Sequence, residues 1–342
     1  MICRLLFFFF FLPVTLPAHT QPKRFTFSQP KMGSSFNIIL YSDDSSHANT
    51  IAMQCFQLVD SLVNIFSDYL DSSELNKLCA VAGKTNNYVM VSPPLFDILW
   101  IAKTAYEKSN GTFDITLGPL TKLWRKARKE KAFPPDLVVK EKLSLTGFKK
   151  IRIDTLTHGV QLLQQGMQLD LGGVAQGYIG QRVIDFLKTK NIVNALVDVS
   201  GDIVTIGAPP GSRGWTVGVN VPGKTDELQK QNLLISNTSV TTSGDLYQYM
   251  EHDHKRYSHI INPRTGYGIT SQKNVTVIAN DGATADWLTK PCSILSTAKA
   301  RRLAHSLQAE VMIAQVKKGK LVCHSTKGFR KYWKKCALAM GN

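Results

Sequence analysis

The sequence predicts an α+β protein of mixed sheets with flanking helices, organised as one large domain or as two lobes. The chain has 342 residues and is 43% hydrophobic, enough to bury a sizeable core. Segments that alternate like strands recur along the chain, and they are interrupted by segments with helical spacing of apolar residues. The two kinds follow each other irregularly, which favours α+β over a doubly wound parallel sheet.

The elements are predicted in order from local signals. A strand pair is expected over residues 24–42, turning at Met32–Gly33, followed by an amphipathic helix over residues 49–66. A second helix should begin after Ser92, whose side chain can cap it ahead of two prolines. The remaining expectations are helices over 175–189, 284–295 and 297–307, one buried strand over 194–207, and strands over 214–220, 233–241, 256–261, 274–280 and 310–315.

The first 20 residues have the pattern of a secretory signal peptide. Arg4 supplies a positive charge, Leu5 to Leu12 is an unbroken apolar run, and prolines precede the small residue Ala18. The run is shorter than the roughly 20 apolar residues of a membrane span, although an uncleaved anchor is the alternative. Cys3 precedes the run, which is the wrong side for a lipoprotein anchor. We therefore expect an exported, periplasmic, soluble protein.

Charge and cysteine content limit the possible partners. The formal net charge is +16, and much of the excess lies in residues 122–131 and 327–335. Such runs are solvated faces or surfaces that attract a phosphate-bearing ligand or a membrane. Nucleic acid is not expected, because no known binding motif is present. Five cysteines follow the signal without CxxC spacing; Cys323 and Cys336 either form a disulfide or, like the others, remain thiols.

The stretch "LDLGGVAQGY" (169–178) places Asp170 beside a glycine pair that opens a predicted helix. Glycines at this position allow backbone N–H groups to approach phosphate oxygens, and the helix dipole favours the anion. The alternative is a turn that merely needs glycine. The stretch fits neither GxGxxG nor the P-loop pattern.

Three further stretches contain candidate functional residues, and each also has a structural explanation. "GTFD" (111–114) is common turn chemistry. His252 and His254 belong to a predicted solvated hairpin tip rather than a metal site. His259 is expected to be partly buried next to a rigid turn, where a lone histidine has either a structural or a functional role. In residues 282–295, Asp286 and Thr289 share a helix face and are oxygen ligands of the kind Mg²⁺ prefers; the alternative is that Thr284 or Asp286 caps the helix.

Eight blocks, taken in order, resemble the signature of the ApbE-type FAD:protein FMN transferases over about residues 25–320, leaving 321–342 as a basic C-terminal tail. They are "MGSSF", "SDYLDSSELNKL", "GTFDITLGPLTKLW", "LDLGGVAQGY", "ALVDVSGDI", "TSGD", "YSHIINPRTGY" and "VTVIANDGATADWL". The resemblance implies one ApbE-like domain around a flavin cleft. It also implies an exported enzyme that splits FAD with Mg²⁺, transfers FMN to a Thr or Ser of a target protein, and releases AMP. The implied targets are flavin-carrying subunits of membrane-associated electron-transport complexes.

The resemblance also assigns roles to residues. His259 would deprotonate the acceptor hydroxyl, and Asp286 would be catalytic and bind the metal. The backbone from Gly173 to Ala175, together with Thr289, would complete the metal site. The residues that would contact the flavin nucleotide are Met32, Tyr69, Thr112, Phe113, Asp114, Asp170, Gln176 and Ile260.

The chain departs from the family pattern at Gln176, Ser200, Asn262 and Lys290, where Lys, Gly, Asp and Thr are usual. The last departure removes a threonine that normally binds the metal. Either Thr289 replaces it, or the Lys290 ammonium takes part of the metal's space and supplies positive charge itself. Two other functions stay open: an FAD pyrophosphatase, in which water replaces the threonine, and an exported FAD-binding protein without catalysis.

Overall fold

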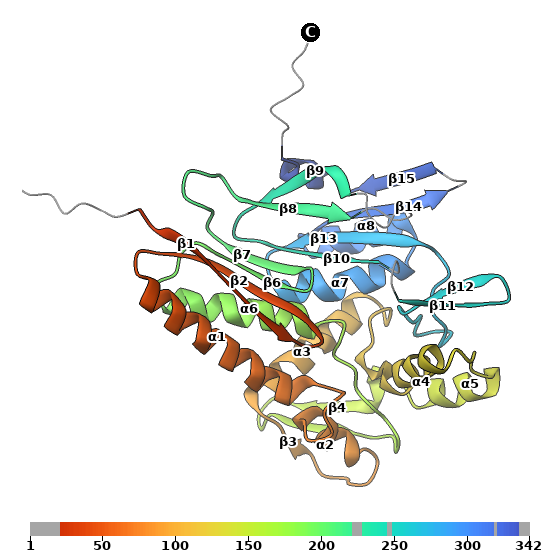
Figure 1. Cartoon of the computed structure of the whole chain (residues 1–342). Helices are drawn as coiled ribbons and strands as arrows, with labels where there is room; N and C mark the ends of the chain where they lie inside the picture. Colours follow the sequence, from red (N-terminus) through yellow and green to blue (C-terminus); the bar gives the residue numbers. More distant parts are fainter. Residues whose placement is uncertain (1–20, 221–227, 245–247, 318–319, 335–342) are drawn as a thin grey trace, which may run out of the picture.

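A computed structural model describes residues 21–220, 228–244, 248–317 and 320–334 of the chain (Figure 1). The expected signal peptide and Cys336 lie outside these residues. Within the described residues, no helix is both long enough and apolar enough to span a membrane.

The centre of the molecule is an eight-stranded sheet in which every neighbouring pair is antiparallel. Its strands, in spatial order, are β1 (Lys23–Lys31), β2 (Ser34–Ser42), β6 (Ala195–Val199), β7 (Asp202–Ile206), β10 (Ser239–Ser243), β13 (Lys273–Ala279), β14 (Glu310–Lys317) and β15 (Lys320–Ser325). An antiparallel sheet with helices gathered on one face is an α+β arrangement, as predicted.

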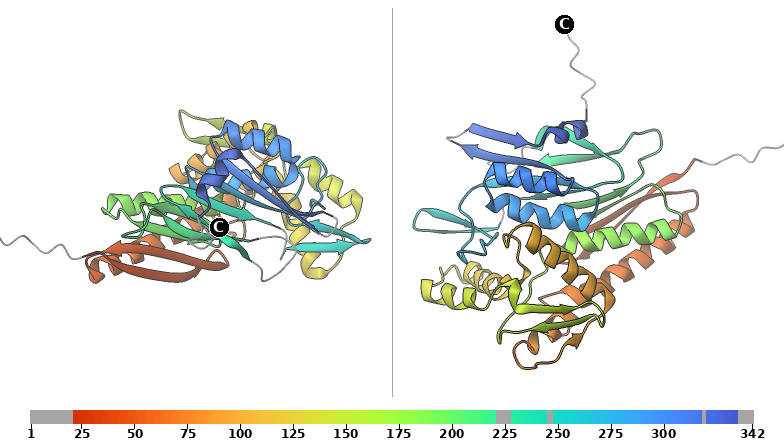
Figure 2. Two further views of the ribbon diagram at one scale, coloured as in Figure 1. Left: turned by 90° about the horizontal axis from the view of Figure 1, so that it is seen from above. Right: turned by 180° about the vertical axis from the view of Figure 1, so that it is seen from behind.

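The two faces of the sheet are covered differently (Figures 1 and 2). Helices α1 (Ser45–Phe66), α6 (Ala175–Thr189), α7 (Gly282–Ile294) and α8 (Thr297–Ser306) pack on one face. The hairpin of β8 (Trp215–Asn220) and β9 (Leu228–Ile235), with the short helix η3 (Lys327–Tyr332), covers the other. Alternate residues of the same strands supply the two cores: Val197 and Val277 face the helices, whereas Leu196 and Ile278 face the hairpin.

A smaller sheet and several helices extend the domain on the helical side. The sheet has the order β3 (Val89–Met90), β5 (Gly159–Leu162), β4 (Ile151–Asp154) and packs with α2 (Glu74–Ala80) and α3 (Pro93–Lys108). The other elements are η1 (Ile115–Leu117), α4 (Gly118–Glu130), α5 (Asp136–Ser144), η2 (Phe148–Lys150) and the hairpin of β11 (Tyr249–His252) and β12 (Lys255–Ser258). The small sheet's Val160 and the main sheet's Val197 belong to one continuous apolar cluster, so the chain forms a single domain.

Several elements begin where the sequence predicts. The Ser92 hydroxyl accepts from the Leu95 N–H at the start of α3, with prolines in the first turn, and Met32 and Gly33 make the turn of the first hairpin with positive φ. The expected helices over 175–189, 284–295 and 297–307 are also confirmed, as α6, α7 and α8.

Two strand predictions are wrong in the same way. The single strand expected over 194–207 is the β6–β7 hairpin, which turns at Ser200 and Gly201 with φ of 59° and 97°. The strand expected over 233–241 is interrupted near Asn237, where φ is 52°, so that β9 and β10 belong to different sheets. In both places residues with positive φ turn the chain within a stretch of strand-forming residues.

The basic C-terminal tail expected over 321–342 needs correction as far as Lys334. β15 is the edge strand of the main sheet, and η3 buries Phe329 completely against the second core. The basic side chains of this segment therefore decorate folded structure, and residues 335–342 lie outside the description.

Candidate active site

Side chains pack closely against both glycines of the bend between Asp170 and α6. Asp170 Oδ1 accepts a hydrogen bond of 2.8 Å from the Gly172 N–H, which holds the bend closed. A Cβ on Gly173 would lie 3.2 Å from Phe113 Cε2 and 3.4 Å from Lys290 Cε. Val174, the N-cap residue of α6, makes no side-chain cap, and the first turn of the helix carries no acidic residue. The bend therefore presents backbone and the helix dipole on one side, and its role as an anion site stays a prediction.

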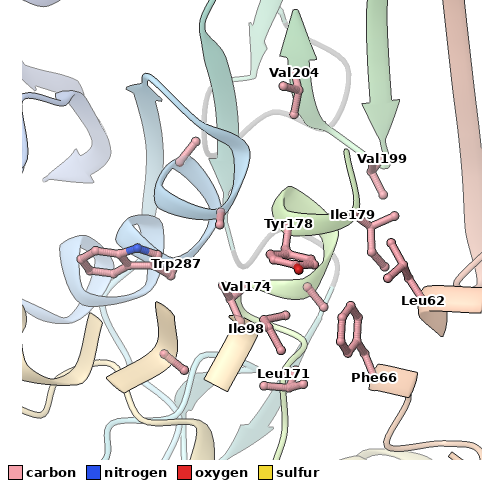
Figure 3. Packing of buried hydrophobic residues seen from close by; sticks show 14 of the residues in the cluster. Leu62, Phe66, Ile98, Leu171, Val174, Tyr178, Ile179, Val199, Val204 and Trp287 are labelled. Atoms are coloured by element: carbon pink, nitrogen blue, oxygen red, sulfur yellow. The ribbon is translucent and has the colours of Figure 1, made fainter. Parts of the chain in front are cut away.

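Helices α6 and α7 cross at two glycines. A Cβ on Gly177 would lie 2.0 Å from the Gly282 carbonyl oxygen, and one on Gly282 would lie 2.2 Å from the Gly177 carbonyl oxygen. Backbones this close bring the Gly177 N–H to 3.1 Å from Asp286 Oδ2. The hydrophobic neighbours of this crossing, including Val174, Tyr178 and Trp287, are shown in Figure 3. The crossing therefore places the Asp286 carboxylate beside the start of α6.

A lysine ammonium forms an ion pair with the other oxygen of this carboxylate. Lys290 Nζ lies 2.5 Å from Asp286 Oδ1 and 3.3 Å from the Asp286 carbonyl oxygen, and the Asp286 side chain is 0% exposed. Thr289 points elsewhere: its buried hydroxyl donates to the Asp286 carbonyl at 2.7 Å. The alternative in which Thr284 or Asp286 caps α7 is wrong. Asp281 is the cap, because its side chain accepts a hydrogen bond from the Thr284 N–H.

The expected Mg²⁺ ligands do not fit a metal in this chain. Both Asp286 carboxylate oxygens are engaged, and the Thr289 hydroxyl is turned into its own helix. Mg²⁺ requires close to octahedral oxygen coordination at about 2.0–2.1 Å. Within the described residues, no three His, Cys, Asp or Glu side chains are grouped so as to hold a metal ion.

A second buried carboxylate, not singled out from the sequence, accompanies this pair. Asp202 begins β7 and is 6% exposed. Its burial, together with the charge of Asp286, raises the pKa of Asp202 to about 8, while Lys290 and a hydrogen bond with Thr241 oppose the rise. The cluster thus holds two carboxylates and one ammonium in a desolvated place.

His259 follows β12 and is half-buried. Burial, followed by the positive charge of Lys290, lowers the pKa of His259 to about 4, so the ring is neutral near pH 7. Its Nδ1 lies 3.3 Å from the Gln248 carbonyl oxygen. Because a carbonyl only accepts, Nδ1 carries the proton and Nε2 is left to accept one.

Arg125 of α4 connects two carboxylates to an aromatic ring. It donates to Asp170 Oδ2 at 3.1 Å and forms a short ion pair with Asp68. Its guanidinium carbon lies 4.3 Å from the centroid of the Tyr69 ring, and Tyr69 is 74% exposed. Burial and the charge of Asp170 raise the pKa of Asp68, and Arg125 opposes this. Arg125, Asp68 and Asp202 were missed by sequence reasoning, since Arg125 lies in a run that resembles a solvated face.

The other predicted residues have contacts of their own. Asp114 accepts from the Thr116 N–H and hydroxyl and caps η1, so its turn role is confirmed, and burial raises its pKa. Phe113 is buried beside Trp287, with ring centroids 5.9 Å apart. Thr112 lines an open cleft of about 240 Å³ with Asn262, Arg264, Ile294, Leu295, Ser296 and Lys299.

The structure brings only part of the predicted set together. Gln176 is half-buried in the first turn of α6, one residue from Gly177, and Ala175 is buried at the helix start. Met32 packs partly buried against the main core. Ile260 donates to the Ser258 hydroxyl and accepts from the Ile269 N–H. The contacts described for Met32 and Ile260 do not reach the Asp286–Lys290 pair, so their predicted roles stay predictions.

A family model and several known proteins match this chain. The model described as "ApbE family" matches residues 32–313. A curated FAD:protein FMN transferase of Klebsiella pneumoniae is 33% identical over 267 residues, covering 78% of this chain and 81% of that protein. A protein of the same name from Treponema pallidum is 30% identical over 284 residues, covering 79% and 78%.

Solved structures agree with the sequence comparisons. The apo form of the flavinyl transferase ApbE of Pseudomonas stutzeri is similar with a TM-score of 0.81 and 25% identity, over 92% of this chain and 98% of that chain. The apbe protein of Thermotoga maritima is similar with a TM-score of 0.81 and 26% identity, over 92% and 100%. The likeness therefore extends over nearly the whole of each chain.

Proposed function

The chain belongs to the ApbE family, and on this basis we propose that it is a FAD:protein FMN transferase. In the proposed reaction, the hydroxyl of an acceptor Thr or Ser attacks the phosphorus of the FMN half of FAD. The bond from that phosphorus to the oxygen bridging the two phosphates breaks, AMP leaves with the bridging oxygen, and the hydroxyl proton passes to a base. Positioning and charge stabilisation supply most of the acceleration in phosphoryl transfer.

One observation carries the proposal: the Gly172–Gly173 bend and the Asp286–Lys290 pair meet. Lys290 Cε is the neighbour that a Cβ on Gly173 would contact at 3.4 Å, and Lys290 Nζ contacts Asp286. Two segments far apart in sequence thus form one place with backbone, helix dipole and charge, where a diphosphate can be held. Had Gly173 and Asp286 lain on opposite sides, the proposal would have had no site.

The neighbouring residues have roles that follow from their contacts. Neutral His259 can accept the hydroxyl proton at Nε2, because Nδ1 faces the Gln248 carbonyl. Exposed Tyr69, held against Arg125, offers a flat ring to the flavin or adenine. Asp170 is bound to Arg125 and Gly172, so it shapes the bend as well as the nucleotide site.

The family's Mg²⁺ enters no step here, because its expected ligands do not fit in this chain. The remaining expectations are proposals that rest on sequence. Export to the periplasm, with association at the inner membrane, is supported by residues 1–20 and by the net charge of +16. The proposed acceptors are flavin-carrying subunits of membrane-associated electron-transport complexes, and nucleic acid is not proposed as a partner.

Incubation of the purified chain with FAD and a flavin-accepting subunit tests the function. In-gel flavin fluorescence on the acceptor, with AMP released, supports transfer. Free FMN with AMP indicates a pyrophosphatase, and unchanged bound FAD indicates a carrier; either result contradicts the proposal. His259→Ala should abolish transfer while FAD binding persists, and His254→Ala, at the exposed tip of the β11–β12 hairpin, is the matched control.

A further inference from the structure

The place where the resemblance implies a metal is already filled by a cation of the chain. Lys290 Nζ lies 2.5 Å from Asp286 Oδ1, while the Gly177 N–H occupies the other carboxylate oxygen at 3.1 Å. An ion approaching Oδ1 would meet the ammonium at a like-charge distance of a few ångströms. In a buried place this repulsion is poorly screened. Binding a divalent metal therefore requires Lys290 to leave first.

The lysine is held in this position by its stem as well as by its charge. Lys290 is four residues after Asp286 on α7, the spacing at which side chains meet on one helix face. A Cβ on Gly173 would lie 3.6 Å from Lys290 Cγ and 3.4 Å from its Cε. The stem thus lies along the bend of residues 172–173. The lysine side chain keeps 23% exposure beside a fully buried carboxylate, so a ligand can reach it.

A second acidic side chain, Asp202, is buried in the same cluster as the ammonium. Because burial and Asp286 raise the pKa of Asp202 to about 8, this side chain is largely protonated near pH 7, and Asp286 is the principal counter-ion of Lys290. An ammonium is a compact point charge with three donors, and lysine binds phosphates in this way in many proteins. Asp286 engages two of these donors, through Oδ1 and its carbonyl oxygen, which leaves one N–H for an anion at the bend.

We propose that Lys290 is the phosphate-neutralising cation of this site, and that cleavage of FAD by this chain needs no divalent metal. The inference rests on the proposed function. As the acceptor oxygen bonds to the FMN phosphorus, the bridging P–O bond breaks and its electron pair stays on the AMP phosphate. The Lys290 ammonium donates to that developing charge, and the acceptor proton goes to His259. Lysine supplies one positive charge where Mg²⁺ would supply two.

The test compares the wild-type chain with Lys290→Thr and Lys290→Met, each in EDTA and in Mg²⁺. The wild-type chain should transfer FMN equally well in both. Lys290→Met should lose transfer in both by roughly 10²-fold or more, the usual cost of removing a charge-stabilising donor. Lys290→Thr should be inactive in EDTA and regain transfer in Mg²⁺. Lys108→Thr, at the exposed end of α3, controls for loss of a surface lysine.

Metal binding supplies a readout that does not depend on activity. Mn²⁺ titration followed by electron paramagnetic resonance should show no tight site in the wild-type chain and one site in Lys290→Thr. The proposal is overturned if EDTA abolishes wild-type transfer and Mg²⁺ restores it, or if the wild-type chain binds Mn²⁺ as tightly as Lys290→Thr. If no form transfers FMN under any condition, the proposed function fails, while the Mn²⁺ titration still decides the fate of the metal site.

Discussion

Replacing Gly177 with alanine tests the helix crossing on which the site depends. The added Cβ would lie 2.0 Å from the Gly282 carbonyl oxygen, 2.6 Å from its carbon and 2.7 Å from Asp286 Cβ. The first two are backbone atoms, so the strain cannot be relieved by a rotamer change. Helices α6 and α7 must separate, which also stretches the 3.1 Å bond from the Gly177 N–H to Asp286.

The magnitude follows from three terms. Overpacking a well-packed core costs about 1–3 kcal/mol, and contact with backbone belongs at the upper end. Weakening a hydrogen bond to a buried carboxylate adds about 1.5 kcal/mol or more. Alanine returns up to about 1 kcal/mol through its helix propensity. The expected loss in free energy of unfolding is therefore about 3 kcal/mol, or a fall in melting temperature of roughly 5 °C for a domain of this size.

Gly180→Ala is the matched control, because it lies on the same helix. Its Cβ would lie 3.1, 3.2 and 4.0 Å from methyl groups of Val204, Val199 and Val197, so its nearest neighbours are side-chain atoms that need to shift by only a few tenths of an ångström. We expect a change within about 1 kcal/mol of wild type in urea unfolding. FAD titration should show weaker binding for Gly177→Ala alone. Equal stability of the two variants would refute the claim that the α6–α7 contact needs glycine at position 177.

Three further outcomes are expected. Because burial and Lys290 lower the pKa of His259 to about 4, wild-type transfer should persist as the pH falls to about 5 and decline near pH 4. Removing the lysine charge should raise the pH at which the remaining activity declines, and a rate–pH profile measures both effects. Arg125→Lys should weaken FAD binding by roughly tenfold in fluorescence titration, because a lysine cannot bridge two carboxylates and stack on a ring. Phe329→Ala should cost about 3–5 kcal/mol in urea unfolding, whereas Leu321→Ala, on a residue 44% exposed, should be close to neutral.

His259 also links the site to stability. Its pKa in the folded chain is about 4, below its ordinary value of 6.5, so the unfolded chain binds the proton more tightly. The contribution of the neutral ring is fully present above pH 6.5 and is lost as the pH falls toward 4. The loss is about 3 kcal/mol at most, since one pKa unit corresponds to about 1.4 kcal/mol. A His259→Gln variant should flatten this part of the stability profile.

The sequence predicts elements well where their signals are local. Ser92 with two following prolines marks a helix start, and Met32–Gly33 marks a turn, because caps and positive φ depend on neighbouring residues only. The hairpin at Ser200–Gly201 was overlooked for the opposite reason. Apolar residues continue on both sides of it, and the continuous pattern concealed a two-residue turn that the Ser–Gly pair could have indicated.

The site was predictable only as far as the resemblance reached. The bend at Gly173 and the carboxylate of Asp286 were expected to converge, and they do. Arg125 was hidden in a basic run, because sequence cannot distinguish a solvated arginine from one held between two carboxylates. The Gly177–Gly282 contact was also invisible, since it joins helices that are distant along the chain and carries no local signal.

The departure at Lys290 was visible in the sequence, yet its consequence was not. A lysine four residues after an aspartate on an exposed helix face would be an ordinary ion pair worth a few tenths of a kcal/mol. Here Asp286 is fully buried, Gly173 leaves room for the lysine stem, and Asp202 adds a second buried carboxylate. Removing the ammonium would leave the buried Asp286 carboxylate without its counter-ion, which typically costs about 3–5 kcal/mol. The same geometry therefore makes Lys290 both a structural partner of Asp286 and a cation whose stem lies against Gly173 of the proposed phosphate site, so that a change at this position should alter stability and metal dependence together.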